Sequence, residues 1–236
     1  MNKNDVIAML ERLKSEDLFS DFKLRKSSCS LIQRTKWGYR RIDLVHYNGF
    51  DLERNDLALE VKPLYWVHFE CLHKWFEKFS FRSLSDQRNT GSVCFSENML
   101  GKSKHFHGFL FLESRQDYEQ DYEIMKNDIL KHASDVFSSF QTINDLYDYE
   151  VDSVLKGKKE FPTSGAEWIF ENLLMTRIVN PEQYDYVKKL ILEHADKLRY
   201  REHPEPNVTI YYDRIPEIIS YLESMPLNKV PPELVR

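Results

Sequence analysis

Hydrophobic residues recur at two different spacings along the chain, and the change of spacing divides it into three parts. Near the N-terminus, apolar residues between Val6 and Leu13 recur every three or four positions, which predicts a short helix capped by Asn4. From Phe22 to about Leu112 apolar and polar residues alternate, which predicts strands with one buried face. The short turns between these strands favour antiparallel pairing.

Helical spacing returns once inside the strand region and then dominates the second half of the chain. Apolar residues three and four apart from Phe69 to Phe79 predict one helix inserted into the sheet. Five further segments show the same spacing or helix-start signals: 118–140, 143–154, 166–179, 181–200 and 213–223.

The predicted fold class is therefore α+β. We expect an antiparallel β-meander of about five strands, with an N-terminal helix and an inserted helix, followed by a helical C-terminal half. Segment 156–162 is charged and ends at Pro162, and eight of the nine prolines lie at or after this residue. This change of composition makes the segment the best linker candidate. The expected domains are an α+β domain over 1–155, a helical subdomain over 160–226 and a tail over 227–236.

Charge is unevenly distributed along the 236 residues, although the net charge is only −5. Residues 1–112 carry 18 basic and 14 acidic side chains, whereas residues 113–153 carry 3 and 11. Three cysteines without a C-x-x-C pair are typical of reduced thiols. Without an N-terminal signal or an apolar stretch of membrane-spanning length, we expect a cytoplasmic protein that has no membrane association.

Two histidines suggest a metal site. His105 and His107 are two positions apart in a segment with strand character, so both imidazoles would point to one face. A site needs at least a third protein ligand, which the sequence does not identify. The alternative interpretation is that both side chains simply lie on the outer face of a strand.

An acid on one predicted strand and an E-x-K on the next form the sharpest catalytic candidate. Asp43, Glu60 and Lys62 resemble the PD-(D/E)-x-K pattern of metal-dependent nucleases. In that pattern two carboxylates hold Mg²⁺, which supplies a hydroxide, and the lysine stabilises the developing phosphate charge. The proline of the pattern is absent, and alternating charges are also typical of any strand that faces solvent.

A basic stretch with interleaved aromatic residues is a candidate binding surface. Residues 22–42 contain seven basic side chains and no acid. Such a strand surface could bind single-stranded nucleic acid through phosphate contacts and base stacking, or it could bind an acidic protein. The candidate binding residues are Arg34, Lys36, Trp37, Tyr39, Arg40 and Arg41.

The long segment 118–140 predicts a helix with an acidic outer face. The acidic positions are Asp117, Asp121, Asp128 and Asp135. Such a face could mimic nucleic acid or bind a basic partner, as proteins that neutralise toxins do.

Residues 1–155 resemble several bacterial families of unknown function that share one layout. The residues that carry the resemblance are the basic strand start Phe22–Lys26 and the aromatic phrase 136–146, with the sequence VFSSFQTINDL. In those families a short helix and an antiparallel sheet precede a long helix that ends in such a phrase. The resemblance implies a bacterial cytosolic module that binds a partner, and it brings no catalytic residues with it.

The leading hypothesis is a non-enzymatic protein that binds another macromolecule, most readily a protein partner, and needs no cofactor. It depends on the segregated charge, the many aromatic residues and the lack of a complete catalytic motif such as G-x-S-x-G or H-E-x-x-H. The first alternative is a Mg²⁺-dependent nuclease or phosphoryl hydrolase. The second alternative is a nucleic-acid-binding module, which the acidic middle of the chain makes less favoured.

Overall fold

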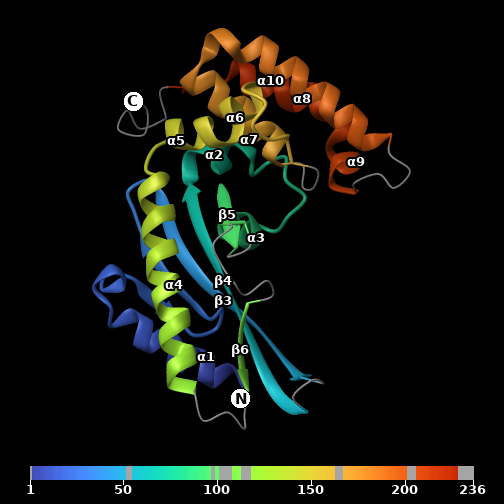
Figure 1. Cartoon of the computed structure of the whole chain (residues 1–236). Helices are drawn as coiled ribbons and strands as arrows, with labels where there is room; N and C mark the ends of the chain where they lie inside the picture. The colour runs from blue at the N-terminus through green and yellow to red at the C-terminus, as the bar shows by residue number, and fades with distance from the viewer. Residues whose placement is uncertain are drawn as a thin grey trace. The chain divides into compact units, whose positions relative to one another are not determined.

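A computed structural model describes residues 2–51, 55–96, 99–100, 108–112, 118–162, 167–200 and 206–227. It has the predicted α+β fold, with an N-terminal helix, an antiparallel sheet and a helical C-terminal half (Figure 1). The chain forms two compact units. Unit 1 contains residues 1–68 and 91–139, and unit 2 contains residues 69–90 and 140–236.

Unit 1 is built on an antiparallel sheet whose two longest strands form its centre. Its strands are β1 (Lys23–Arg25), β2 (Ser30–Arg34), β3 (Gly38–Asp51), β4 (Asp56–Phe69), β5 (Val93–Ser96) and β6 (Phe109–Leu112). The strand order is β1-β2-β3-β4-β5, and β6 also pairs with β4. This order confirms the predicted meander.

The pairing along β4 is interrupted at a proline. Strand β5 pairs with β4 from Leu64 to Val67, whereas β6 pairs with it from Ala58 to Val61. Pro63, which has no N–H to donate, lies between the two paired stretches. Gly108 precedes β6 with a φ of 112°, and a Cβ atom there would lie 2.7 Å from the Val61 carbonyl oxygen.

Two helices cover one face of this sheet. Helix α1 (Lys3–Lys14) and helix α4 (Tyr118–Ser139) run beside each other over the strands (Figure 1). The Tyr122 hydroxyl donates a hydrogen bond to the Met9 carbonyl oxygen at 3.3 Å, and Arg12 lies 3.6 Å above the Tyr122 ring. The residues that fill this core are Val6, Met9, Leu10, Leu13, Ile42, Leu44, Val61, Tyr65, Val67, Met125, Ile129 and Ala133. Each fully buried aliphatic side chain contributes about 1.5–3 kcal/mol.

The first helix begins two residues earlier than predicted. Asn2, and not Asn4, is the N-cap, because the Asn2 side chain accepts a hydrogen bond from the Asn4 N–H at 2.8 Å. The Asp5 carboxylate in turn accepts from the Asn2 N–H, which completes a capping box.

Unit 2 is helical and has α7 at its centre. Its helices are α2 (Glu70–His73), α3 (Leu84–Asn89), α5 (Ile143–Tyr147), α6 (Ser153–Leu155), α7 (Glu167–Val179), α8 (Tyr184–Arg199), α9 (Pro206–Tyr212) and α10 (Ile215–Ser224). Shorter turns are η2 (Lys74–Phe76), η3 (Asp148–Asp152) and η4 (Pro181–Gln183). Helix α7 contacts α2, α5, α8 and α10, which explains why it is apolar on most of its circumference.

Three details of unit 2 differ from the prediction. The inserted helix expected from Phe69 to Phe79 is a four-residue helix followed by a 3-10 turn. Helix α9 was not predicted. The boundaries between the two units lie at 68/69, 90/91 and 139/140, and not at 156–162. Segment 69–90 and residues 140–155 pack with α7: the Phe76 ring stacks on Phe170 at 4.9 Å, and α5 contacts α7.

Among the helices of the described ranges, none combines the length and the apolar character needed to cross a membrane.

We expect Gly38→Ala to lower the free energy of unfolding by about 3 kcal/mol, because a Cβ atom would lie 1.8 Å from the His68 carbonyl oxygen. The melting temperature should fall by roughly 6–12 °C. Gly49→Ala is the control on the same strand, because its Cβ atom would meet nothing within 4 Å. Equal melting temperatures of the two variants would contradict the close approach of β3 and β4 at Gly38.

Candidate functional site

Four basic side chains lie on the sheet face opposite α1 and α4. Arg40 lies over the Phe137 ring of α4, so its neighbours Tyr39 and Arg41 point to the opposite face. Strand register adds the remaining members across β1 and β2. Arg34 pairs with Tyr39, Lys23 and Arg41 both pair with Ile32, and Arg25 and Asp43 both pair with Ser30. We call Lys23, Arg25, Arg34 and Arg41 the basic face.

Most of the positive charge on the basic face is not neutralised by acidic side chains. Arg41 forms an ion pair with Asp43, with 3.0 Å between Nε and Oδ1. Within the described part of the chain, Lys23, Arg25 and Arg34 have no salt-bridge partner. Lys23 and Arg34 are exposed and Arg25 is half-buried, so this charge faces solvent along β1 and β2.

Tyr39 lies at the buried end of the basic face. Its ring stacks on His68 with 4.6 Å between ring centres and an angle of 9° between the planes. The guanidinium carbons of Arg34 and Arg41 lie 5.6 and 5.4 Å from the ring centre. The residue is only 1% exposed, and its hydroxyl is buried with no hydrogen-bond partner within the described structure. A buried hydroxyl left unpaired costs about 1–3 kcal/mol.

Burial also determines how the two acidic groups of this region ionise. It raises the pKa of Tyr39 to about 12, with a smaller increase from Asp43, although Arg41, Arg34 and Arg25 lower it. The pKa of Asp43 is raised for the same reason, and the favourable contacts with Arg41 and Trp66 offset only part of this increase. Tyr39 is therefore a protonated donor at neutral pH.

The nuclease-like residues share this sheet face, but the structure does not bring both acids together. The ring contacts Tyr39–His68 and Arg41–Trp66 show which residues of β3 and β4 are neighbours. They place Asp43 opposite Leu64, four residues, or about 13 Å, along the strand from Glu60. Glu60 instead forms an ion pair with Lys62 at 3.1 Å.

Among the described residues, no group of three or more histidine, cysteine, aspartate or glutamate side chains is arranged to hold a metal ion. His105 and His107 lie outside the described residues.

The predicted basic stretch divides between different parts of unit 1. Arg40 is on the helix face, and Lys36 and Trp37 lie in the turn between β2 and β3. Only Arg34, Tyr39 and Arg41 of the six predicted binding residues share the outer face. Lys23 and Arg25 belong to the same basic stretch and join them on this face, because β1 pairs with β2, a pairing that the sequence does not predict.

The acidic helix face is less concentrated than the basic face. Asp121, Asp128 and Asp135 follow one another at intervals of seven residues on α4, so they lie on one side of the helix. Ile124, which is 43% exposed, and Lys131 lie between them. Asp117 lies outside the described residues.

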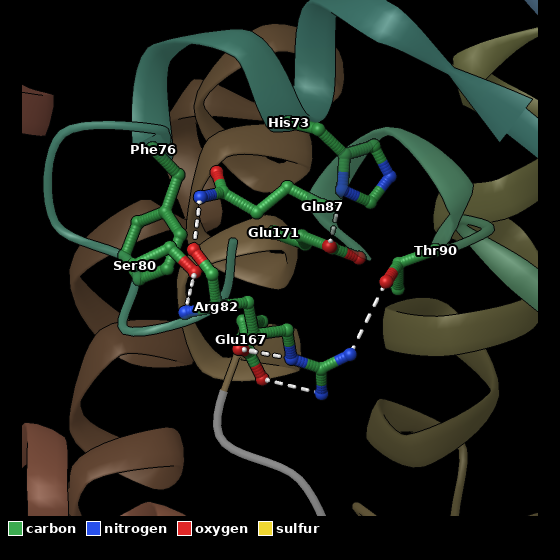
Figure 2. A pocket seen from close by; sticks show the side chains of 8 residues that line it. All are labelled: His73, Phe76, Ser80, Arg82, Gln87, Thr90, Glu167 and Glu171. Carbon is green, nitrogen blue, oxygen red and sulfur yellow. Dashed lines mark hydrogen bonds and ion pairs between the residues drawn. The ribbon is translucent and has the colours of Figure 1, made fainter. Parts of the chain in front are cut away.

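A small polar pocket in unit 2 is a second candidate site. It is open to solvent and has a cavity volume of about 20 Å³, which is space for about one water molecule (Figure 2). The residues that line it are His73, Phe76, Ser80, Arg82, Gln87, Thr90, Glu167 and Glu171. In Figure 2, His73 and Arg82 point toward the two glutamates of α7, with 3.0 Å between Nδ1 of His73 and Glu171 and 3.0 Å between Nε of Arg82 and Glu167.

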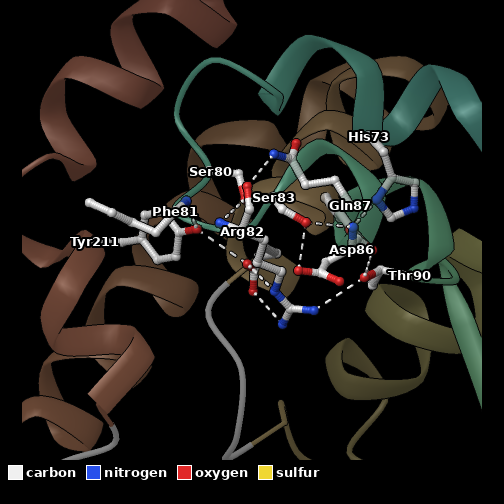
Figure 3. Close-up of polar contacts among 11 residues, drawn as sticks. His73, Ser80, Phe81, Arg82, Ser83, Asp86, Gln87, Thr90 and Tyr211 are labelled. Atoms are coloured by element: carbon white, nitrogen blue, oxygen red, sulfur yellow. Dashed lines mark hydrogen bonds and ion pairs between the residues drawn. The ribbon is translucent and has the colours of Figure 1, made fainter.

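The polar groups of this pocket bind one another. Arg82 donates to Thr90 at 3.1 Å, and the Gln87 amide donates to the Arg82 carbonyl oxygen at 2.8 Å. The Tyr211 hydroxyl donates to Glu167 at 3.2 Å and accepts from the Phe81 N–H (Figure 3). The network therefore connects segment 80–90 to α7 and α9, and its role is best explained as structural.

Comparisons of the chain with protein-family models, with curated proteins and with solved structures found no match. The resemblance over residues 1–155 stays an expectation from the sequence.

We expect Glu167→Ala to lower the free energy of unfolding by about 1–3 kcal/mol, because it leaves Arg82 and Tyr211 without their shared acceptor. Urea unfolding measures this loss. Glu217→Ala is the control, because Glu217 is 62% exposed and within the described ranges pairs only with Arg214. Its cost should stay below about 0.5 kcal/mol. Equal effects of both variants would show that the pocket network does not stabilise unit 2.

Proposed function

We propose that this protein is a non-enzymatic binding module whose basic face recognises an acidic segment of a partner protein. One observation carries the proposal: three basic side chains without a carboxylate partner lie together on one sheet face, beside a single acid that Arg41 already neutralises.

The chemistry of these side chains suits carboxylates. A guanidinium group can donate two parallel hydrogen bonds to one carboxylate, and such charged hydrogen bonds are stronger than neutral ones. Arg25 and Arg34 also lie on a sheet, which holds their backbone positions fixed before the partner binds. Preorganisation of this kind lowers the entropy cost of binding.

The exposure of Tyr39 favours a protein partner over single-stranded nucleic acid. Binding of single strands depends on aromatic rings on which bases can stack. Tyr39 stacks on His68 and is 1% exposed, so it offers no surface to a base.

The geometry gives less support to a nuclease. Asp43 is paired with Arg41 and Glu60 with Lys62, and the two acids are separated along the sheet. A shared Mg²⁺ would require both carboxylates to leave these partners and approach each other.

The proposal is tested with a fluorescent 20-residue oligoglutamate peptide, followed by polarisation as salt is raised. We expect saturable binding that weakens with salt, and roughly tenfold or greater weakening in the double variant Arg25→Ala/Arg34→Ala. The control is Lys189→Ala/Lys197→Ala, which removes the same charge from exposed positions of α8 and should leave affinity unchanged.

Two results would contradict this function. One is an equal loss of affinity in both double variants, which would show a response to net charge and not to the basic face. The other is tighter binding of an oligothymidylate of the same length, with the same dependence on Arg25 and Arg34, which would identify a nucleic-acid partner instead.

A further inference from the structure

Strand β1 lies at an edge of the sheet, because the strand order begins with it and, among the described strands, only β2 pairs with it. An edge strand presents main-chain N–H and C=O groups that have no ladder partner on its open side. Another extended segment can bind there by continuing the sheet. The register of the neighbouring strands determines which groups β1 presents.

Alternate residues of β2 direct their main-chain groups to β3. The Thr35 N–H, just after β2, donates to the Gly38 carbonyl oxygen at 3.1 Å, and the Leu44 N–H donates to the Cys29 carbonyl oxygen at 2.9 Å. Both bonds continue the register of β2 with β3, so the odd-numbered residues of β2 form its hydrogen-bonded pairs. The even-numbered residues of β2 therefore bond to β1.

Leu24 consequently has its N–H and C=O groups on the open side of β1. Ser30 pairs with Arg25 and Ile32 pairs with Lys23, so the main-chain groups of Lys23 and Arg25 point to β2. Leu24 lies between these two residues, and its main-chain groups point the other way. Among the described residues, its N–H and C=O have no hydrogen-bond partner on the open side.

The side chains that flank Leu24 select the charge of a strand that binds at this edge. Lys23 and Arg25 project from the basic face, and neither has a salt-bridge partner within the described ranges. Side chains directly opposite on an added strand would lie about 4.5–5.5 Å away between Cβ atoms, where opposite charges stabilise the pair and like charges destabilise it. Antiparallel pairing of two copies of β1 about Leu24 would bring Lys23 of one copy against Arg25 of the other. The charges therefore disfavour a second copy and favour an acidic strand.

We propose that an acidic strand of the partner protein adds to the open edge of β1 in antiparallel orientation. Its central residue exchanges two main-chain hydrogen bonds with Leu24, and the acidic residues on either side of that residue lie opposite Lys23 and Arg25. This inference rests on the proposed function and specifies the partner segment as an extended strand with acidic residues at alternate positions.

The residue of the partner opposite Leu24 is apolar. Leu24 pairs with Leu31, which in turn pairs with Ile42, and this row of side chains faces the helix-covered core. Leu24 is half-buried at the margin of that core, so an apolar neighbour on the added strand extends the buried surface. The pattern that this edge recognises is therefore acidic, apolar, acidic.

The test uses the full ¹⁵N-labelled chain and the capped peptide Glu-Val-Glu-Val-Glu-Val-Glu at pH 7.5. We expect saturable amide shifts in β1 and, at saturation, roughly tenfold or greater slowing of hydrogen exchange at the Leu24 N–H, because the added strand protects it. The amides of Lys23 and Arg25 already bond to β2 and are the internal control. The same peptide with glutamine in place of glutamate should bind roughly tenfold more weakly.

Two N-methylated peptides distinguish strand addition from attraction of charge alone. Methylation of the valine amides removes the N–H that donates to the Leu24 carbonyl oxygen, whereas methylation of the glutamate amides changes N–H groups that point away from β1. We expect the valine-methylated peptide to bind roughly tenfold or more weakly than the glutamate-methylated one. Equal affinities, the reverse order or unchanged exchange at Leu24 would overturn the inference.

The failure of this inference and that of the proposed function give different results. If oligoglutamate binding depends on Arg25 and Arg34, but the two methylated peptides bind equally and exchange at Leu24 does not change, the strand inference is wrong and the acidic-partner function stands. If neither oligoglutamate nor the alternating peptide binds, both proposals are wrong.

Discussion

The pairing of β3 with β4 separates the apolar side of unit 1 from its polar side. Along both strands, alternate residues point to opposite faces, so Ile42, Leu44 and Val67 reach the helix-covered core while Tyr39, Arg41 and Trp66 reach the other face. A shift of one residue in this pairing would place arginines against α1 and α4. The close approach of Gly38 to the His68 carbonyl oxygen leaves no space for any side chain at that position.

Burying polar groups on the basic face of unit 1 costs free energy of folding. Arg41 is buried and its partner Asp43 is half-buried, and the pKa of Asp43 is raised because burial outweighs the attraction of Arg41. Buried ion pairs of this kind often contribute little to stability, because desolvation offsets the attraction between the charges. The unpaired hydroxyl of Tyr39 adds a further cost. Well-packed apolar residues at these positions would form a sheet of equal or greater stability.

Unit 2 contrasts with this arrangement, because its polar groups satisfy one another. The two glutamates of α7 accept hydrogen bonds from His73, Arg82 and Tyr211, which belong to three different segments. These bonds surround an aromatic cluster in which Phe76 stacks on Phe170 and contacts Tyr211. The polar groups that line this pocket therefore bind one another, whereas Lys23, Arg25 and Arg34 of unit 1 have no salt-bridge partner among the described residues.

The sequence by itself determined the fold class, the order of helices and strands, and the basic character of residues 22–42. Those features depend on the spacing and the composition of residues within one segment, and both can be read directly from the sequence. Only the tertiary structure decided that Lys23 and Arg25 lie with Arg34 and Arg41 on one sheet face, whereas Arg40 lies on the face covered by helices. The reason is that strand register is set by pairing partners distant in sequence. It also decided that Asp43 and Glu60 stay apart and that segment 69–90 packs with α7. These outcomes depend on which surfaces bury each other, and no local pattern contains that information.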